Sequence, residues 1–305
     1  MNKNSWFISI GTDVYPKLLS EIYNPPKKLF YKGKLEILNK PCVAVVGTRS
    51  HTEYGEFLTQ KIISELAVLD IAIVSGLAKG IDTIAHEAAL ENDLPTIAVL
   101  GSGINNIYPK CNNNLAEKIE EKGLILSEYE GETEPIDFQF PQRNRIISGL
   151  SIAIIVIEAP TRSGALITAK LALDQNREIF TIPGDIDRET SIGPLHLIQY
   201  CGAYPVSSGQ EIVEILQKQP HLFAKPKPKT WGIVAQAPKE KITINFNLAP
   251  NESKIFQMLS KNRAQTLEQI QKKTALLPEK ILASLSMLEI QNLIKISPKG
   301  YLRNA

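Results

Sequence analysis

Short apolar runs rich in β-branched residues recur along the chain, each ending near a small residue and each followed by an amphipathic stretch. Runs of this kind, without polar alternation, are typical of strands buried on both faces of a parallel sheet. We expect strands at 42–47, 71–76, 96–101, 124–126, 152–157 and 178–182. We expect helices at 57–67, 80–90, 112–121, 163–175 and 209–217. Because such alternation requires right-handed crossovers, the sequence predicts an α/β fold with a Rossmann-like, doubly wound, mainly parallel sheet.

Composition divides the rest of the sequence into three further parts. Residues 1–40 mix proline and lysine around short apolar pieces, and we expect a lead-in segment that packs on the Rossmann-like domain at 41–219. Residues 220–250 contain several prolines and lysines with little apolar periodicity, which indicates a stiff, extended linker. Residues 251–305 are typical of three short helices and two strands, the layout of a small C-terminal winged helix-turn-helix domain.

Charge is unevenly distributed, although the formal net charge is only +2. Residues 221–305 contain 14 Lys+Arg and 5 Asp+Glu, a net of +9, whereas residues 1–220 contain 20 and 27, a net of −7. A basic C-terminal part favours nucleic acid or an acidic partner. A solvated lysine-rich surface explains the same residues equally well.

Several classes of protein are disfavoured by what the sequence lacks. No apolar run approaches the roughly 20 residues of a membrane span, and the N-terminus has no apolar region typical of a secretory signal. Cys42, Cys111 and Cys201 lie far apart without a CxxC pair, so neither a disulfide framework nor a zinc site is indicated. We therefore expect a cytoplasmic protein with no membrane partner and no metal.

Small and cationic residues follow the expected strands, at the edge where a doubly wound sheet binds its ligands. These loop residues are Gly47, Thr48 and Arg49, then Gly76, Lys79 and Gly80, and finally Ser163 and Gly164. Glycine and serine before a helix leave its N-terminal amides open to an anion. With Arg49 and Lys79 beside them, they predict phosphate binding. Neither GxGxxG nor GxxxxGK[ST] occurs, so a nucleotide cofactor is disfavoured and we expect none.

An aromatic ring and two cations precede the expected strand at 152–157. Phe140 is followed by Arg143, Asn144 and Arg145, which we place just before a helix or tight turn. A ring beside cations fits base stacking combined with phosphate contact, as in binding of single-stranded nucleic acid. Alternatively, either arginine alone can pair structurally with an acid such as Glu158.

The sequence gives only weak evidence for catalytic groups. Asp82 and His86 share one expected helical face, but two groups are too few for a metal site. We interpret Asp82 as a cap or dipole partner and His86 as an inward, hydrogen-bonded group. Ser163 and Thr168 lack a GxSxG elbow and suit hydrogen bonding at a helix N-terminus. The sequence contains no catalytic constellation, so we expect no catalytic residue and no enzyme.

Taken together, these residues resemble the bacterial DNA-processing family DprA, also called Smf, from about residue 15 to 216. The motifs that carry the resemblance are Val45-Val-Gly-Thr-Arg49, Thr52-Glu-Tyr-Gly55, Ser75-Gly-Leu-Ala-Lys-Gly-Ile-Asp82, Ala85-His86, Tyr108-Pro109, Phe140-Pro-Gln-Arg-Asn-Arg-Ile-Ile-Ser-Gly-Leu150, Val156-Ile-Glu-Ala159, Ser163-Gly-Ala-Leu-Ile-Thr168 and Ile182-Pro-Gly184. Motifs of this length in this order are far more specific than a single glycine-rich loop. Thr48 and Lys79 depart from the serine and arginine frequent in the family, and the helical domain that precedes the sheet in many members is absent or cut to a remnant before residue 40.

The resemblance implies a domain that binds single-stranded DNA without hydrolysing it. Such proteins protect incoming DNA in natural transformation, help to load the RecA recombinase and tend to form homodimers. By matching position, Arg49 would contact the DNA backbone, the Arg143–Arg145 segment would line the same pocket, and Phe140 would stack on bases.

Two other classes remain as alternatives. A nucleotide phosphoribohydrolase resembling the LOG family has a similar sheet, but its Pro-Gly-Gly-x-Gly-Thr turn is replaced here by Pro160-Thr-Arg-Ser-Gly-Ala165. A winged-helix transcription regulator is the second alternative, and it is weakened because the motifs lie in the sheet domain.

Overall fold

The computed structural model describes residues 6–218, 249–259, 265–274, 276–290, 293–297 and 300–303. The chain divides into two compact units, one ending at residue 228 and the other beginning at residue 229. Most of the expected linker at 220–250 lies outside the described residues.

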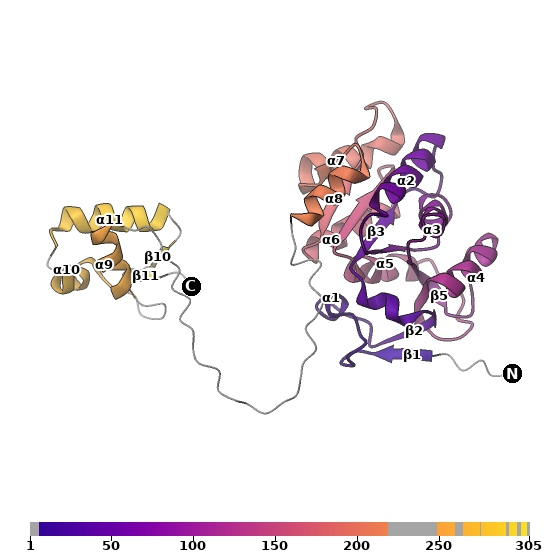
Figure 1. Cartoon of the computed structure of the whole chain (residues 1–305), viewed down its shortest axis with the longest axis horizontal. Helices are drawn as coiled ribbons and strands as arrows, with labels where there is room; N and C mark the ends of the chain where they lie inside the picture. Colours follow the sequence, from indigo (N-terminus) through magenta and orange to yellow (C-terminus); the bar gives the residue numbers. More distant parts are fainter. Residues whose placement is uncertain are drawn as a thin grey trace. The chain divides into compact units, whose positions relative to one another are not determined.

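The first unit is built on one nine-stranded sheet (Figure 1). Its strands are β1 (Trp6–Ser9), β2 (Lys28–Gly33), β3 (Cys42–Val46), β4 (Ala72–Ser75), β5 (Thr96–Gly103), β6 (Leu124–Tyr129), β7 (Ala153–Val156), β8 (Glu178–Thr181) and β9 (Tyr204–Pro205). Their spatial order is β1-β2-β6-β5-β4-β3-β7-β8-β9. The pairings from β6 to β9 are all parallel, whereas β1–β2 and β2–β6 are antiparallel. The predicted mainly parallel α/β fold is therefore confirmed.

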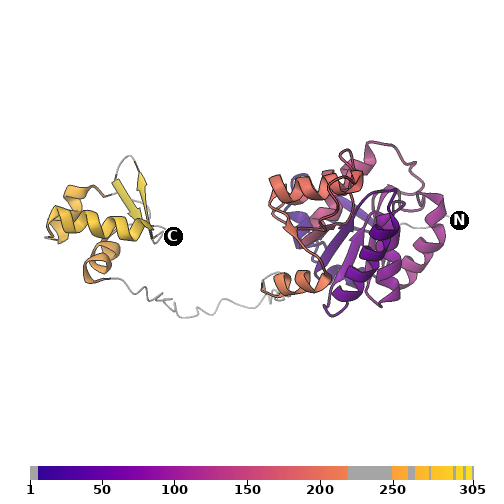
Figure 2. The ribbon, with the colours of Figure 1, turned by 90° about the horizontal axis from the view of Figure 1, so that it is seen from above.

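Helices cover both faces of this sheet (Figure 2). They are α1 (Lys17–Ser20), α2 (Glu53–Leu66), α3 (Ile81–Glu91), α4 (Asn113–Lys122), α5 (Gln139–Leu150), α6 (Gly164–Asp174), α7 (Ile192–Cys201) and α8 (Gly209–Gln217). Successive residues of β3 point to opposite faces. Ala44 and Val46 pack in the core beneath α5 and α6, while Val43 and Val45 pack beneath α2 and α3. The sheet is thus doubly wound, as predicted.

The order of the strands reverses at β3. From β3 the chain runs outward through β4, β5 and β6, and it then returns to place β7 on the other side of β3. In doubly wound sheets ligands bind at such a reversal, beyond the carboxyl ends of the strands. The loops after β3, β4, β5 and β7 lie at this edge, so their side chains are the candidates for a ligand-binding site.

Two parts of the first unit differ from the sequence expectations. Residues 1–40 were expected to be a lead-in segment that packs on the Rossmann-like domain; in the structure β1 and β2 are part of the main sheet itself, with β1 at its edge and β2 between β1 and β6. Arg143, Asn144 and Arg145 were expected just before a helix or turn, but they lie inside the 12-residue helix α5. Pro141 occupies the first turn of α5, where its missing N–H costs little. Helix α7 was not among the expected elements.

The second unit contains three helices followed by a two-stranded antiparallel sheet. Its elements are α9 (Pro250–Met258), α10 (Leu267–Thr274), α11 (Pro278–Ile290), β10 (Ile294–Ser297) and β11 (Gly300–Arg303). Ile255, Ile270, Ile281, Leu285 and Leu288 form its buried core. This is the expected order of elements, and the assignment to the winged-helix class stays a prediction.

Candidate functional site

The residues after β3, β4 and β5 form a small hollow with the N-terminal part of α5. It has a volume of about 60 Å³ and is lined by Arg49, Gly76, Ala78, Lys79, Tyr108, Pro109, Phe140 and Arg143. We call it the cation–aromatic hollow. It lies at the carboxyl edge of the parallel strands, the position that the loop motifs predicted.

A cation and two rings face one another in the cation–aromatic hollow. The Arg49 guanidinium carbon lies 5.6 Å from the centroid of the Phe140 ring, within the range of a cation–π contact. The centroid of the Tyr108 ring lies 5.6 Å from that of Phe140. Among the described residues, the salt bridges include no carboxylate partner for Arg49 or Lys79. Both side chains are exposed, so their charges are available to an anion.

Arg143 forms the buried side of the hollow. Its guanidinium, only 5% exposed, donates hydrogen bonds from Nη1 to the carbonyls of Gly76 (2.7 Å) and Val99, and from Nε to Asn144 Oδ1 (3.2 Å). Burial lowers the pKa of Arg143 to about 10, with the Asp82 carboxylate opposing the shift and Arg49 adding to it. Arg143 therefore stays charged at neutral pH, as a fixed positive charge beneath the loops.

Asp82 secures the β4–α3 loop from its other side. Its Oδ2 accepts hydrogen bonds from the amides of Gly76 (3.1 Å) and Ala78 (3.4 Å). Burial raises the pKa of Asp82, and the Arg143 charge with these two amides opposes the shift. Asp82 is thus a loop partner in the first turn of α3, consistent with its interpretation from the sequence.

His86 lies deeper in the same helix, fully buried, with Nδ1 2.7 Å from Thr96 Oγ1. Burial lowers the pKa of His86 to about 3, and the Arg143 charge acts in the same direction. It is an inward, hydrogen-bonded group, as interpreted. Within the described ranges, no three or more His, Cys, Asp or Glu side chains are arranged to hold a metal ion.

Glycine brings the β4–α3 loop onto the β3–α2 loop. Gly80 has a φ of +80°, and a Cβ there would lie 2.3 Å from the Thr48 carbonyl oxygen. That carbonyl accepts a hydrogen bond from Ile81 N (3.2 Å), and a Cβ on Gly47 would lie 2.5 Å from the Ile81 side chain. Thr48 is itself buried, and its hydroxyl accepts from Ser50 N (3.2 Å). Gly47, Thr48 and Gly80 therefore shape the turn that exposes Arg49.

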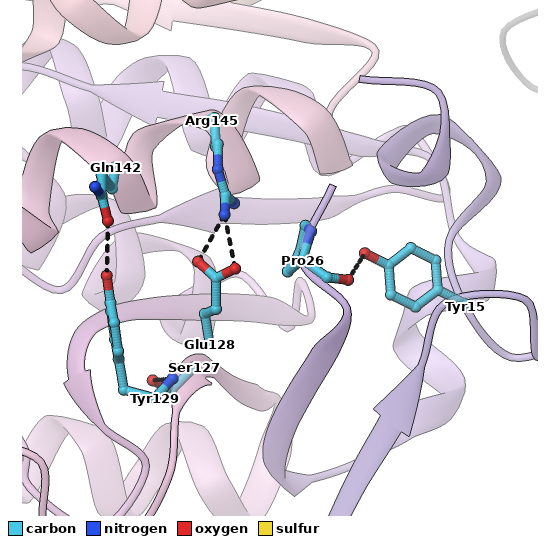
Figure 3. Close-up of polar contacts among 7 residues, drawn as sticks. All are labelled: Tyr15, Pro26, Ser127, Glu128, Tyr129, Gln142 and Arg145. Atoms are coloured by element: carbon cyan, nitrogen blue, oxygen red, sulfur yellow. Dashed lines mark hydrogen bonds and ion pairs between the residues drawn. The ribbon is translucent and has the colours of Figure 1, made fainter. Parts of the chain in front are cut away.

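Arg145 does not reach the cation–aromatic hollow. Its Nη2 donates to both carboxylate oxygens of Glu128 at 2.7 Å, beside a hydrogen bond from the Tyr129 hydroxyl to Gln142 (Figure 3). It lines a separate hollow of about 880 Å³. The expectation that Arg143 and Arg145 line one pocket is wrong in this respect, because residues two apart on a helix point in nearly opposite directions. The acid that pairs with Arg145 is Glu128 rather than Glu158.

Asn144, Ser163 and Gly164 also lie outside the lining of the cation–aromatic hollow. Asn144 Nδ2 donates to the Gly164 carbonyl (3.3 Å), which ties α5 to the start of α6. Ser163 caps α6 by accepting from Ala165 N (3.2 Å), and Thr168 Oγ1 donates to the Gly164 carbonyl (3.2 Å). These are the helix N-terminal roles interpreted for Ser163 and Thr168. A DNA contact at Ser163 or Gly164 stays a prediction.

Tyr108 lines the hollow but was not among the predicted site residues. Its signal was the Tyr108-Pro109 pair after the third expected strand, which appeared only among the motifs of the family resemblance. An aromatic residue in a loop has no periodic pattern, so position along the chain alone does not separate it from a core residue.

Fold and site define a class: a doubly wound α/β protein with cations and aromatic rings, rather than a nucleotide fingerprint, at its ligand-binding edge. The family model described as DNA recombination-mediator protein A matches residues 6–217, and the chain belongs to this family. Among the described residues, no helix is long and apolar enough to span a membrane.

Individual relatives agree with the family assignment. DNA processing protein DprA of Streptococcus pneumoniae is 50% identical over 205 residues, which cover 67% of this chain and 72% of that protein. DprA of Bacillus subtilis is 40% identical over 220 residues, covering 72% and 74%.

Solved structures of two members of the family are also similar. The DprA structure from S. pneumoniae has a TM-score of 0.67 at 48% identity and covers 70% of this chain and 74% of that one. The DprA structure from Helicobacter pylori, described as giving insight into that protein's single-stranded DNA binding mode, has a TM-score of 0.64 at 33% identity, covering 72% and 99%.

Proposed function

We propose that this chain binds single-stranded DNA at the cation–aromatic hollow and acts as a recombination mediator without catalysing a reaction. The observation that carries the proposal is the exposed Arg49 guanidinium over the Phe140 ring, next to Tyr108. Cations beside stacking surfaces are the combination that binds single strands without sequence preference. Membership of the recombination-mediator family and the single-stranded DNA binding mode studied in the H. pylori protein support it.

Each group of the hollow has a chemical role in this proposal. Arg49 and Lys79 neutralise backbone phosphates from the solvent side, and Phe140 and Tyr108 offer ring faces to the bases. Arg143 supplies a buried positive charge that also holds the β4–α3 loop. Because an unpaired base exposes its ring face while a duplex does not, stacking selects single strands over duplex DNA.

Membership of the recombination-mediator family supports a proposal for the wider role. We propose that the protein protects incoming single-stranded DNA during natural transformation, helps to load RecA onto it, and works as a homodimer in the cytoplasm. The basic second unit then contacts either duplex DNA or a protein, since a fold alone does not fix its function.

A direct test compares the affinity of the full chain for oligo-dT with its affinity for a duplex of equal length. We expect the single strand to bind at least tenfold more tightly in a gel-shift or anisotropy titration. Equal affinity for the duplex would contradict the proposal.

A further inference from the structure

Glu158 stands at the reversal of strand order, two residues after β7 and beside β3. It is only 5% exposed. Its backbone carbonyl accepts a hydrogen bond from Thr48 N (2.7 Å), at the start of the β3–α2 loop. Its main chain therefore fixes the first end of the loop that carries Arg49.

The carboxylate of Glu158 fixes the other end of that loop. Oε2 accepts from Thr52 N (2.9 Å), and Oε1 accepts from Thr52 Oγ1 (2.6 Å). A Cβ on Gly55 would lie 2.2 Å from Oε2, so the first turn of α2 packs directly on the carboxylate. Arg49 therefore lies between Thr48 and Thr52, which are both hydrogen-bonded to Glu158.

Within the part of the chain that the structure describes, no Lys, Arg or His forms a salt bridge with the Glu158 carboxylate. Its partners are instead an amide at the N-terminus of α2, where the helix dipole favours negative charge, and two hydroxyls. The second hydroxyl belongs to Thr190, in the short helix η3 (Glu189–Ser191), and its Oγ1 donates to Glu158 Oε1 (3.3 Å). The backbone carbonyl of Thr190 also accepts a hydrogen bond from Ala159 N (2.8 Å).

We propose that Glu158 is a positioning residue of the cation–aromatic hollow, which sets where Arg49 lies without touching the ligand. The inference rests on the proposed function of the hollow. It also assigns a role to the loop before α7. Thr190 and Thr52 both donate to the Glu158 carboxylate, so a shift of that loop would change the hydrogen bonds that hold the β3–α2 loop.

The test is a double-mutant cycle on oligo-dT affinity with the full chain. Glu158→Gln replaces one acceptor oxygen with a donor while keeping the Thr52 cap on Gly55 N (3.1 Å). We expect Glu158→Gln to weaken binding about three- to tenfold. In the Arg49→Ala background the same substitution has no further effect, within about twofold, because coupled residues are not additive. Additive losses would overturn the inference and leave Glu158 with a general structural role.

Glu65→Gln is the matched control. Glu65 Oε2 accepts from Gly209 N (2.6 Å) at the start of α8, so this substitution also removes a carboxylate from a helix N-terminus, away from the hollow. We expect unchanged oligo-dT affinity. A loss equal to that of Glu158→Gln would overturn the inference, since any weakened helix start would then suffice.

If Glu158→Gln fails to fold, substitutions of Thr52 test the same hydrogen bonds between Thr52 and Glu158. Thr52→Ser retains both hydrogen bonds to Glu158, whereas Thr52→Ala retains only the backbone one. We expect wild-type affinity for Thr52→Ser and a loss for Thr52→Ala that vanishes in the Arg49→Ala background. Equal affinity of both variants would contradict the inference. A wild-type chain that fails to bind oligo-dT at all would remove the proposed function, and this inference with it.

Discussion

Arg143 and Asp82 hold the two backbone polar groups of a single residue: the Gly76 carbonyl accepts from Arg143 Nη1, and the Gly76 amide donates to Asp82 Oδ2. A Cβ at Gly76 would lie 2.6 Å from Arg143 Nη2 and 2.7 Å from Asp82 Oδ2. The two buried side chains therefore pack against a position without a side chain, and together they hold the start of the β4–α3 loop in place.

Gly76→Ala should destabilise the first unit by roughly 1–3 kcal/mol, because the added methyl would clash with the buried Arg143 and Asp82 side chains. Urea unfolding followed by circular dichroism measures this. Gly164→Ala is the control: nothing lies within 4 Å of a Cβ there, and the residue begins α6. An equal loss of stability in the two variants would refute the account of Gly76.

Arg143→Ala should cost about 1–3 kcal/mol of stability, because it leaves the buried carbonyls of Gly76 and Val99 without their donor. Arg49→Ala, at an exposed position, should stay within about 0.5 kcal/mol of the wild type. Both substitutions are expected to reduce DNA binding, but for different reasons. Unfolding curves recorded beside the binding curves separate them, and a wild-type midpoint for Arg143→Ala would refute the structural role.

Arg145→Ala should leave oligo-dT affinity unchanged within about twofold while lowering stability by roughly 1–3 kcal/mol, since Glu128 loses the Nη2 group that donates to both of its carboxylate oxygens. The side chains of Arg145 and Glu128 are 13% and 25% exposed, so the pair is partly shielded from solvent. Anisotropy titrations and urea unfolding measure the two quantities. A tenfold loss of affinity in a folded variant would place Arg145 in the DNA site after all.

His86 should make the folded state sensitive to acid. Its pKa is about 3 in the folded chain and near its ordinary value when unfolded, so below about pH 6.5 the unfolded state binds the extra proton. This contribution lowers the free energy of unfolding by about 2 kcal/mol between pH 7 and pH 5. His86→Asn cannot titrate in this range, so its free energy of unfolding should fall by about 2 kcal/mol less than that of the wild type between pH 7 and pH 5. An identical slope in the two proteins would exclude His86 as the source.

The fold was predictable because parallel strands buried on both faces leave unbroken apolar runs, as at Val43–Val46. Strands β1 and β2 pair antiparallel and are only partly buried, so residues 6–9 and 28–33 lack that signal in the sequence. Within the site, Arg49 was found from its loop. The sequence does not separate Arg143 from Arg145, because both lie in α5 and differ only in the side of the helix from which they project. That side depends on the residue at which α5 begins. Tyr108 enters the hollow through tertiary packing on Phe140, which spacing along the chain does not encode.

The central claim is that Arg49 in the cation–aromatic hollow contacts the backbone of single-stranded DNA. It is tested most directly by the salt dependence of oligo-dT affinity for the wild type, Arg49→Ala and Lys28→Ala. Lys28 is the control because its ammonium lies 4.6 Å from the Phe7 ring centroid on the edge strands, a cation–aromatic pair outside the hollow. We predict that Arg49→Ala binds about tenfold more weakly at low salt, with a log–log salt slope smaller by about 0.7, the value for one phosphate contact on a single strand. Lys28→Ala should match the wild type. An Arg49→Ala variant with wild-type affinity and slope would contradict the account.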